Sequence, residues 1–176
     1  MATVRWNIDN AHSTVEFVAR HLVVTKVRGH FTKWSGHIDI DHDDLTKSSA
    51  SATIEVASVD TREPQRDGHL KSPDFLDAEK FPQITFASKT VQKDGSDLQV
   101  TGDLTIHGVT KEVSLHVENH GTNKDPWGNT RALFAAKTHI NRKDFGLGWN
   151  QVLETGGVLV SEKIEIEIEI QAVKAA

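Results

Sequence analysis

The sequence predicts an all-β fold: an eight-stranded antiparallel β-barrel with one short helical segment near residues 63–78. Apolar and polar residues alternate with a period of two through most of the chain, which is typical of half-buried strands. The connections between these runs are mostly short and several contain glycine, so neighbouring strands should be antiparallel. We find no linker, internal repeat or low-complexity stretch, and we expect residues 1–176 to form one domain.

The final run, residues 158–170, is the strongest strand signal. Its apolar residues fall on even positions and its glutamates on odd ones. These positions predict an inward and an outward face, namely Ile164, Ile166 and Ile168 inward and Glu165, Glu167 and Glu169 outward. At ~3.3 Å per residue and a tilt of about 40°, a strand of this length gives a barrel roughly 33 Å tall. That height favours a closed barrel over a sandwich.

Earlier parts of the chain show the same period and legible turns. Between residues 27 and 40 the apolar phase changes from odd to even positions, so we expect a bulge of one extra residue that bends a long strand there. The dipeptide His107-Gly108 and the segment 93–97 predict tight hairpins, because glycine supplies the positive φ that such turns need. Residues 119–130 predict a longer loop.

Composition excludes several classes of protein. The net charge is −5 with no basic run, so nucleic acid is not an expected partner. The absence of cysteine excludes disulfides, thiolate metal sites and cysteine nucleophiles. No apolar run approaches the roughly 20 residues of a membrane-spanning helix. The opening residues, MATVRWNIDN, lack the features of a signal peptide, so we expect a cytoplasmic protein unless a leader has been removed.

Five segments in series carry a family resemblance. They are WNIDNAHSTVEFVARHL, VRGHFTKWSGHI, TREPQRDGHLKSPDFLDAEKFPQITFAS, GDLTIHGVTKEVSL and INRKDFGL. From about Trp6 to the final strand, the chain closely resembles the YceI-like, polyisoprenoid-binding family. The resemblance implies a lipocalin-like barrel that holds a long isoprenoid lipid, either a polyprenyl phosphate or diphosphate or an isoprenoid quinone. Many members of that family carry secretion signals.

The segment QRDGHLKSPDFLD, residues 65–77, holds the densest group of reactive side chains. Asp67 and His69 are spaced as two metal ligands would be, but no H-E-x-x-H frame accompanies them, so we predict no metal site. No G-x-S-x-G motif is present, and we predict that the protein is not an enzyme. An enzyme that acts on an isoprenoid-type lipid, with His69 as acid or base, is the alternative.

We interpret this segment as a short helical lid. In the structural reading, Arg66 and Asp67 form a buried ion pair that pins the helix across the barrel, and each can also pair with polar groups at the strand ends. Leu70, Phe75, Leu76 and Phe81 then plug the interior. In the functional reading, the segment closes one mouth with His69 and Leu70 facing the cavity, where a polar lip would meet a quinone carbonyl or a diphosphate. Arg142 and Asp144 repeat the Arg/Asp pattern, and we read them as structural.

The predicted ligand-binding residues combine inward strand positions with the lid. They are Phe17, Phe31, Trp34, His69, Leu70, Phe75, Phe86, Leu104, Phe134, Trp149 and Ile166. Trp149 follows a glycine-containing segment, where an indole would gate entry.

The sequence therefore predicts non-catalytic binding, storage or transport of an isoprenoid lipid, with no cofactor other than that ligand. A structural or interaction barrel whose core is filled by its own side chains is a further alternative. We also predict a homodimer formed near the barrel mouths through Trp127 or Trp149, because loop tryptophans are enriched at interfaces.

Overall fold

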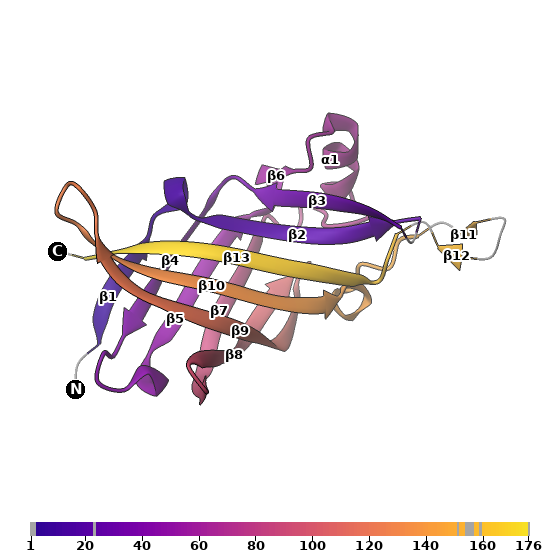
Figure 1. Cartoon of the computed structure of the whole chain (residues 1–176). Coiled ribbons are helices and arrows are strands. Elements are labelled where there is room, and N and C mark those ends of the chain that lie inside the picture. The colour runs from indigo at the N-terminus through magenta and orange to yellow at the C-terminus, as the bar shows by residue number, and fades with distance from the viewer. Residues whose placement is uncertain (1–2, 23, 151, 154–156, 159, 176) are drawn as a thin grey trace.

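In the computed structural model, which describes residues 3–22, 24–150, 152–153, 157–158 and 160–175, the chain forms a closed antiparallel β-barrel (Figure 1). The sheet closes because β1 pairs with both β4 and β13. The strands of the barrel are β1 (Val4–Ile8), β2 (Thr14–His21), β3 (Thr25–Phe31), β4 (Trp34–Ile40), β5 (Ser49–Glu55), β6 (Val59–Asp60), β7 (Gln83–Asp94), β8 (Asp97–Ile106), β9 (Val109–Lys124), β10 (Thr130–Asn141) and β13 (Lys163–Lys174). The predicted eight-stranded barrel is confirmed, because six of these strands are halves of three interrupted ones.

The interruptions lie at one level of the barrel. β1 and β2 are separated by η1 (Asn10–His12), and β5 and β6 by η3 (Val56–Ser58). Between them, residues 32–33 separate β3, which pairs with β2 and β6, from β4, which pairs with β1 and β5. The expectation of a single-residue bulge was therefore wrong. Three adjacent strands break together, so this part of the sheet bends as a unit and the apolar phase changes between two separate strands.

Both predicted hairpins are present. His107 and Gly108 have φ angles of 55° and 71°, and they connect Ile106 to its partner Val109. Gly95, with φ 64°, lies in the turn that joins the paired Asp94 and Asp97. The long loop expected at 119–130 was wrong: β9 continues to Lys124, which pairs with Thr130. Residues 118–124 are polar on both faces, so no apolar alternation marks them as a strand.

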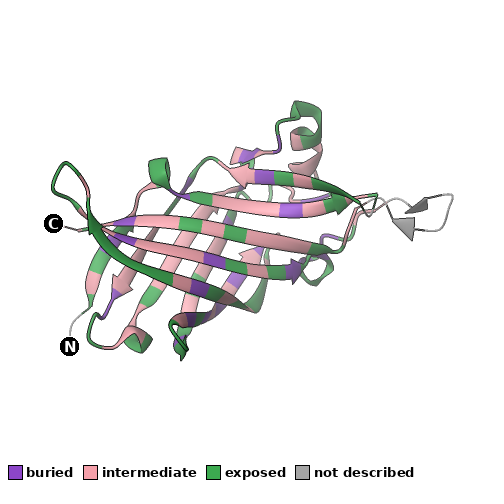
Figure 2. Cartoon of the chain, in the orientation of Figure 1, coloured by how far each residue is buried: buried purple, intermediate pink, exposed green. Residues whose placement is uncertain are grey.

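The terminal strand begins later than the sequence indicated. β13 starts at Lys163, whereas Val158 belongs to a separate short pairing of β11 (Val152–Leu153) with β12 (Gly157–Val158). Its two faces are as predicted. Ile164, Ile166, Ile168 and Ile170 line the interior, and Glu167 and Glu169 are exposed. Figure 2 shows exposed and less exposed residues alternating in the second half of β10 and the middle of β13.

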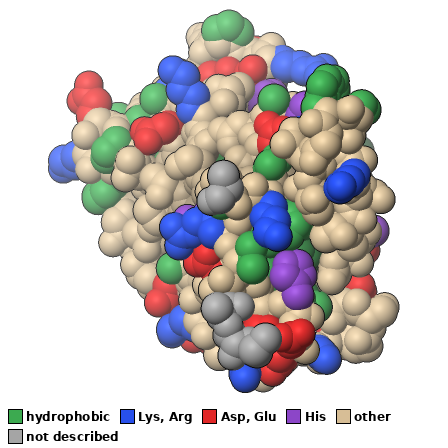
Figure 3. All heavy atoms as spheres, turned by 90° about the vertical axis from the view of Figure 1, so that its left-hand side faces the viewer, with side chains coloured by type: hydrophobic (Ala, Val, Ile, Leu, Met, Phe, Trp, Pro, Cys, Tyr) green, Lys and Arg blue, Asp and Glu red, His purple; other side chains and the backbone are tan. Residues whose placement is uncertain are grey.

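One end of the barrel is closed by its own core. Trp6, Ile40, Ala132 and Ala172 form a buried cluster there, and Leu45 of η2 (Leu45–Lys47) packs against it. Both chain termini lie at this end (Figure 1). Its surface carries acidic and basic side chains intermixed (Figure 3). Arg131 of β10 pairs with Asp9 and Asp125. The helix α1 (Pro64–Leu70) and the 3-10 helix η4 (Arg142–Phe145) lie toward the opposite end, hereafter the mouth.

Candidate ligand cavity

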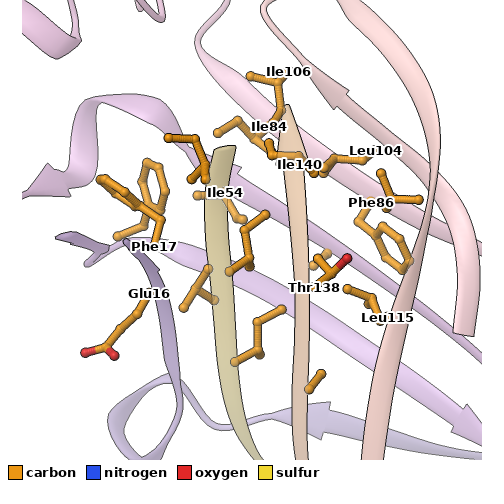
Figure 4. Close-up of a pocket in the computed structure, with 18 of the residues that line it drawn as sticks. Glu16, Phe17, Ile54, Ile84, Phe86, Leu104, Ile106, Leu115, Thr138 and Ile140 are labelled. Carbon is orange, nitrogen blue, oxygen red and sulfur yellow. The ribbon is translucent and has the colours of Figure 1, made fainter. Parts of the chain in front are cut away.

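An apolar cavity of about 470 Å³ occupies the barrel interior. This volume lies in the range of small-molecule binding sites in proteins, roughly 300–1,000 Å³. Figure 4 shows Phe17, Ile54, Phe86, Leu104 and Ile140 directed into it from different strands. The alternation of the strands creates this lining, because every second residue of each strand faces inward.

The structure places every predicted ligand-binding residue on the cavity wall. These residues are Phe17, Phe31, Trp34, His69, Leu70, Phe75, Phe86, Leu104, Phe134, Trp149 and Ile166. The wall runs from Leu45 and Ile40 at the closed end to Trp149 and Val160 at the mouth. Contact of these side chains with a ligand stays a prediction.

Three aromatic rings lie together at the mouth. His69 meets Phe75 and Trp149 edge-on, with ring centroids 5.0 Å and 4.7 Å away, and the centroids of Phe75 and Trp149 are 5.1 Å apart. The Nε2 atom of His69 also lies 3.0 Å from Asp74 Oδ2. Edge-to-face contacts of this kind are favourable beyond the area they bury. The cluster joins α1 and the segment after it to the segment after η4.

Arg142 fixes the position of Trp149. Its guanidinium is buried, 3% exposed, and donates to the carbonyl oxygens of Leu147 (2.6 Å), Trp149 (2.8 Å), Ser161 (2.9 Å) and Val160 (3.4 Å). Burial lowers the pKa of Arg142, and the charge of Glu162 opposes that effect. The structural role expected of Arg142 is present, but its partners are backbone carbonyls and not Asp144, which is exposed.

The lid helix is held by Thr61 rather than by a buried ion pair. Asp67 Oδ1 accepts from the backbone N–H of Thr61 (2.9 Å) and from its hydroxyl (2.6 Å). Arg66 donates to the hydroxyl and carbonyl oxygens of Thr61, both at 2.8 Å, and is itself exposed. Glu63 caps the helix by accepting from two backbone N–H groups of its first turn. The expected ion pair was wrong, although the expected anchoring to a strand end is present.

Three of the four side chains that were predicted to plug the barrel interior lie at the cavity. Leu70, Phe75 and Leu76 line the cavity. Phe81 does not, which corrects the expectation: its ring packs against His107, 4.7 Å away, and beside Gly108 on the β8–β9 turn.

Most polar residues of the lining gather at the two ends, and Thr138 lies between them. The mouth contributes Arg20, His21, Arg66, His69 and Arg142, while Ser48, Ser49 and Ser51 lie toward the closed end. Glu16 is also at the wall, but its carboxylate points away from the apolar side chains (Figure 4). Sequence reasoning missed Arg20, His21 and Arg142 as lining residues. His21 was detectable, because it continues the inward series Val15, Phe17 and Ala19.

Two other features are absent from the described ranges. Within them, no three His, Asp or Glu side chains are grouped as metal ligands. In the same ranges, no helix is long and apolar enough to cross a membrane.

The two tryptophans of the dimer hypothesis lie at opposite ends. Trp127 is 79% exposed in the turn before β10, at the closed end. Trp149 follows β10 and η4 and contacts His69 and Phe75 at the mouth. A homodimer stays a prediction, and each tryptophan would imply a different interface.

Comparison with known proteins gives one consistent result. The family model of the YceI-like domain matches residues 6–172. A UPF0312 protein of Staphylococcus aureus (strain MSSA476) is 39% identical over 163 residues, which cover 92% of this chain and 93% of the relative. The crystal structure of a Campylobacter jejuni YCEI protein matches with a TM-score of 0.77 at 33% identity, over 89% of this chain and 90% of the other. A polyisoprenoid binding domain from Saccharophagus degradans matches with a TM-score of 0.69 at 17% identity, over 98% and 99%.

Proposed function

The chain belongs to the YceI-like family, and from that premise we propose that it binds one long isoprenoid lipid inside the barrel as a carrier or store. The continuous apolar lining from Leu45 to Trp149 is the observation that carries this proposal. An apolar chain that enters such a cavity gains about 25 cal/mol for each Å² removed from water. The description of the Saccharophagus degradans domain as polyisoprenoid binding supports the same ligand class.

The distribution of polar residues orients the ligand. The isoprenoid tail occupies the interior, and the head group lies at the mouth beside His69, His21 and Arg66. These side chains carry N–H donors, so the head group is a hydrogen-bond acceptor. Phosphate or diphosphate oxygens and quinone carbonyls share this property, and charge-assisted bonds favour the phosphates.

We propose binding without turnover. His69 packs edge-on against Phe75 and Trp149, which is a closing role. Its contact with Asp74 is also what an acid or base at the mouth would have. Catalysis is therefore the second candidate, and incubation with a polyprenyl diphosphate or a quinone separates the two. Unchanged lipid after prolonged incubation supports binding.

The experiment that tests the proposal is organic extraction of protein purified without detergent, followed by mass spectrometry of the extract. We expect an isoprenoid lipid at about one molecule per chain. Extracts that contain no isoprenoid, from protein expressed in cells that make such lipids, would contradict the proposal.

A further inference from the structure

The turn between β2 and β3 presents apolar side chains to solvent. Leu22 and Val24 are 46% and 78% exposed, and with Trp127 they are the exposed large hydrophobic residues of the described chain. Leu22 has a φ of 52°, a left-handed conformation that glycine or asparagine adopts at lower cost. The backbone N–H of Val24 donates to the Leu22 carbonyl at 2.8 Å. Solubility favours polar residues at both positions, and the backbone conformation at Leu22 favours glycine or asparagine. The two apolar side chains therefore point to a partner that accepts apolar groups.

Beyond Glu16, the same hairpin is basic. From residue 17 to the end of β3 at residue 31 it contains three Lys or Arg and no Asp or Glu, in a chain whose net charge is −5. Arg20 and Lys26 are direct partners in the β2–β3 pairing, and Arg28 lies two residues after Lys26 on β3. All three are exposed. Within the described ranges, no carboxylate lies within ion-pair distance of any of them. Like charges that face each other across strands are unfavourable, and an anionic surface relieves that repulsion.

This hairpin adjoins the mouth of the cavity. His21, which precedes the turn, lines the cavity and forms an isolated antiparallel β-bridge with Val160. The backbone N–H of Ser161 donates to the Arg20 carbonyl, the backbone N–H of Arg20 donates to the Ser161 hydroxyl oxygen, and the Ser161 carbonyl accepts from Arg142. The turn lies at the end of the barrel opposite the chain termini (Figure 1). The closed end, by contrast, carries charges of both signs (Figure 3).

We propose that this hairpin docks the mouth of the barrel on an anionic phospholipid bilayer. Leu22 and Val24 enter the apolar edge of the bilayer, while Arg20, Lys26 and Arg28 contact its anionic head groups. The biological purpose of this docking rests on the proposed function. A docked mouth lets a lipid pass between the bilayer and the cavity without crossing water. The docking itself is measured independently of any bound isoprenoid.

Vesicle flotation tests the docking. We expect the protein to float with vesicles of phosphatidylcholine and phosphatidylglycerol, to remain behind with phosphatidylcholine alone, and to be released by salt. The double variant Lys26→Gln with Arg28→Gln should bind about fivefold more weakly for each charge removed, which corresponds to ~1 kcal/mol per charge. The double variant Leu22→Asn with Val24→Thr should also bind severalfold more weakly. Asparagine suits the left-handed backbone, so this variant should keep the wild-type melting temperature.

A matched control removes one basic and one apolar residue from the closed end. Lys124→Gln with Trp127→Ser should float as the wild type does. The inference is overturned if the hairpin variants float like the wild type, or if wild-type binding is the same with and without phosphatidylglycerol. It is also overturned if Leu22→Asn with Val24→Thr abolishes a dimer seen by sedimentation and vesicle binding is absent, because the tip would then cover a second copy of the chain.

The lipid content of the same proteins separates this inference from the proposed function. Hairpin variants that retain extractable isoprenoid but no longer float support both the proposed function and the docking. Wild-type protein that carries no isoprenoid, but floats through the hairpin, upholds the docking and contradicts the carrier role. Wild-type protein that carries isoprenoid and floats independently of the hairpin contradicts the docking alone.

Discussion

The ring of Phe17 lies directly against Gly29 on the neighbouring strand, so that a Cβ atom added to Gly29 would stand 2.3 Å from Phe17 Cζ. The two residues are direct partners in the β2–β3 pairing. The missing side chain of Gly29 therefore makes the space that the aromatic ring occupies at the cavity wall. This contact explains a glycine within a strand, where the residue is otherwise unfavourable.

The first prediction is that Gly29→Ala lowers the free energy of unfolding by about 1–3 kcal/mol, because Phe17 must leave its position. Adding Phe17→Leu should restore part of the loss. Gly68→Ala is the matched control: no atom lies within 4 Å of its added Cβ, and alanine favours the helix. Denaturant unfolding measures all four proteins. A Gly29→Ala protein as stable as the wild type would show that the ring moves freely.

A second prediction concerns the inward face of β13. Ile166→Glu should destabilise the fold by several kcal/mol, roughly 2–4, because it places an unpaired charge in the apolar cavity. Glu167→Gln, on the exposed face of the same strand, should change stability by no more than about 0.5 kcal/mol. Thermal unfolding compares them. An Ile166→Glu melting temperature within a degree or two of the wild type would argue against the assigned face.

The lid gives the third prediction. Leu70→Asp puts a charge at the cavity mouth, so isoprenoid retention during purification should fall while the barrel stays folded. Gln65→Asp changes an exposed position of the same helix and should retain lipid as the wild type does. Circular dichroism and lipid extraction are the two readouts. Full retention by a folded Leu70→Asp protein would mean that the segment is not a lid.

A pH dependence is expected at the closed end. Arg131 donates to Asp9 (2.7 Å), and this bond, with a further one from His12, lowers the pKa of Asp9 from 3.8 to about 2. The ionised Asp9 therefore stabilises the fold above about pH 4, and that stabilisation is lost as the pH falls through about 2. Arg131→Met should thus be less stable than the wild type at pH 7. The difference should narrow on acidification from pH 4 to pH 2, and denaturant midpoints across that range measure it. A difference that stays constant down to pH 2 would assign the role of Arg131 to packing.

Several features of the fold could be predicted because the residue pattern within one strand is enough to indicate them. The isoleucines of β13 and the rings at Phe17, Phe86 and Phe134 follow from alternation alone, since each strand residue faces either the interior or the solvent. The interruptions around residues 32–33 could not be predicted in the same way. They arise where three neighbouring strands bend together, which is a property of the closed sheet.

The residues of the site also divide into those that the sequence could predict and those that it could not. The aromatic lining has an apolar signal in the sequence, but the partners of Arg142 are backbone carbonyls, which no side-chain pattern encodes. The Arg66–Asp67 pair was misread for this reason too, because Thr61 supplies the hydroxyl and backbone groups that satisfy both. The repulsion between Arg20 and Lys26 emerges only once the strand register places them opposite each other.

The most direct test of the central claim is native mass spectrometry of two matched variants that differ only in which side of β5 they enlarge. Ala52 lines the cavity and pairs with Phe86, whereas its neighbour Thr53 faces outward. We predict that wild type and Thr53→Phe carry one isoprenoid molecule per chain and that Ala52→Phe, folded but with its cavity narrowed, carries less. Equal lipid occupancy in Ala52→Phe and Thr53→Phe would contradict binding inside the barrel.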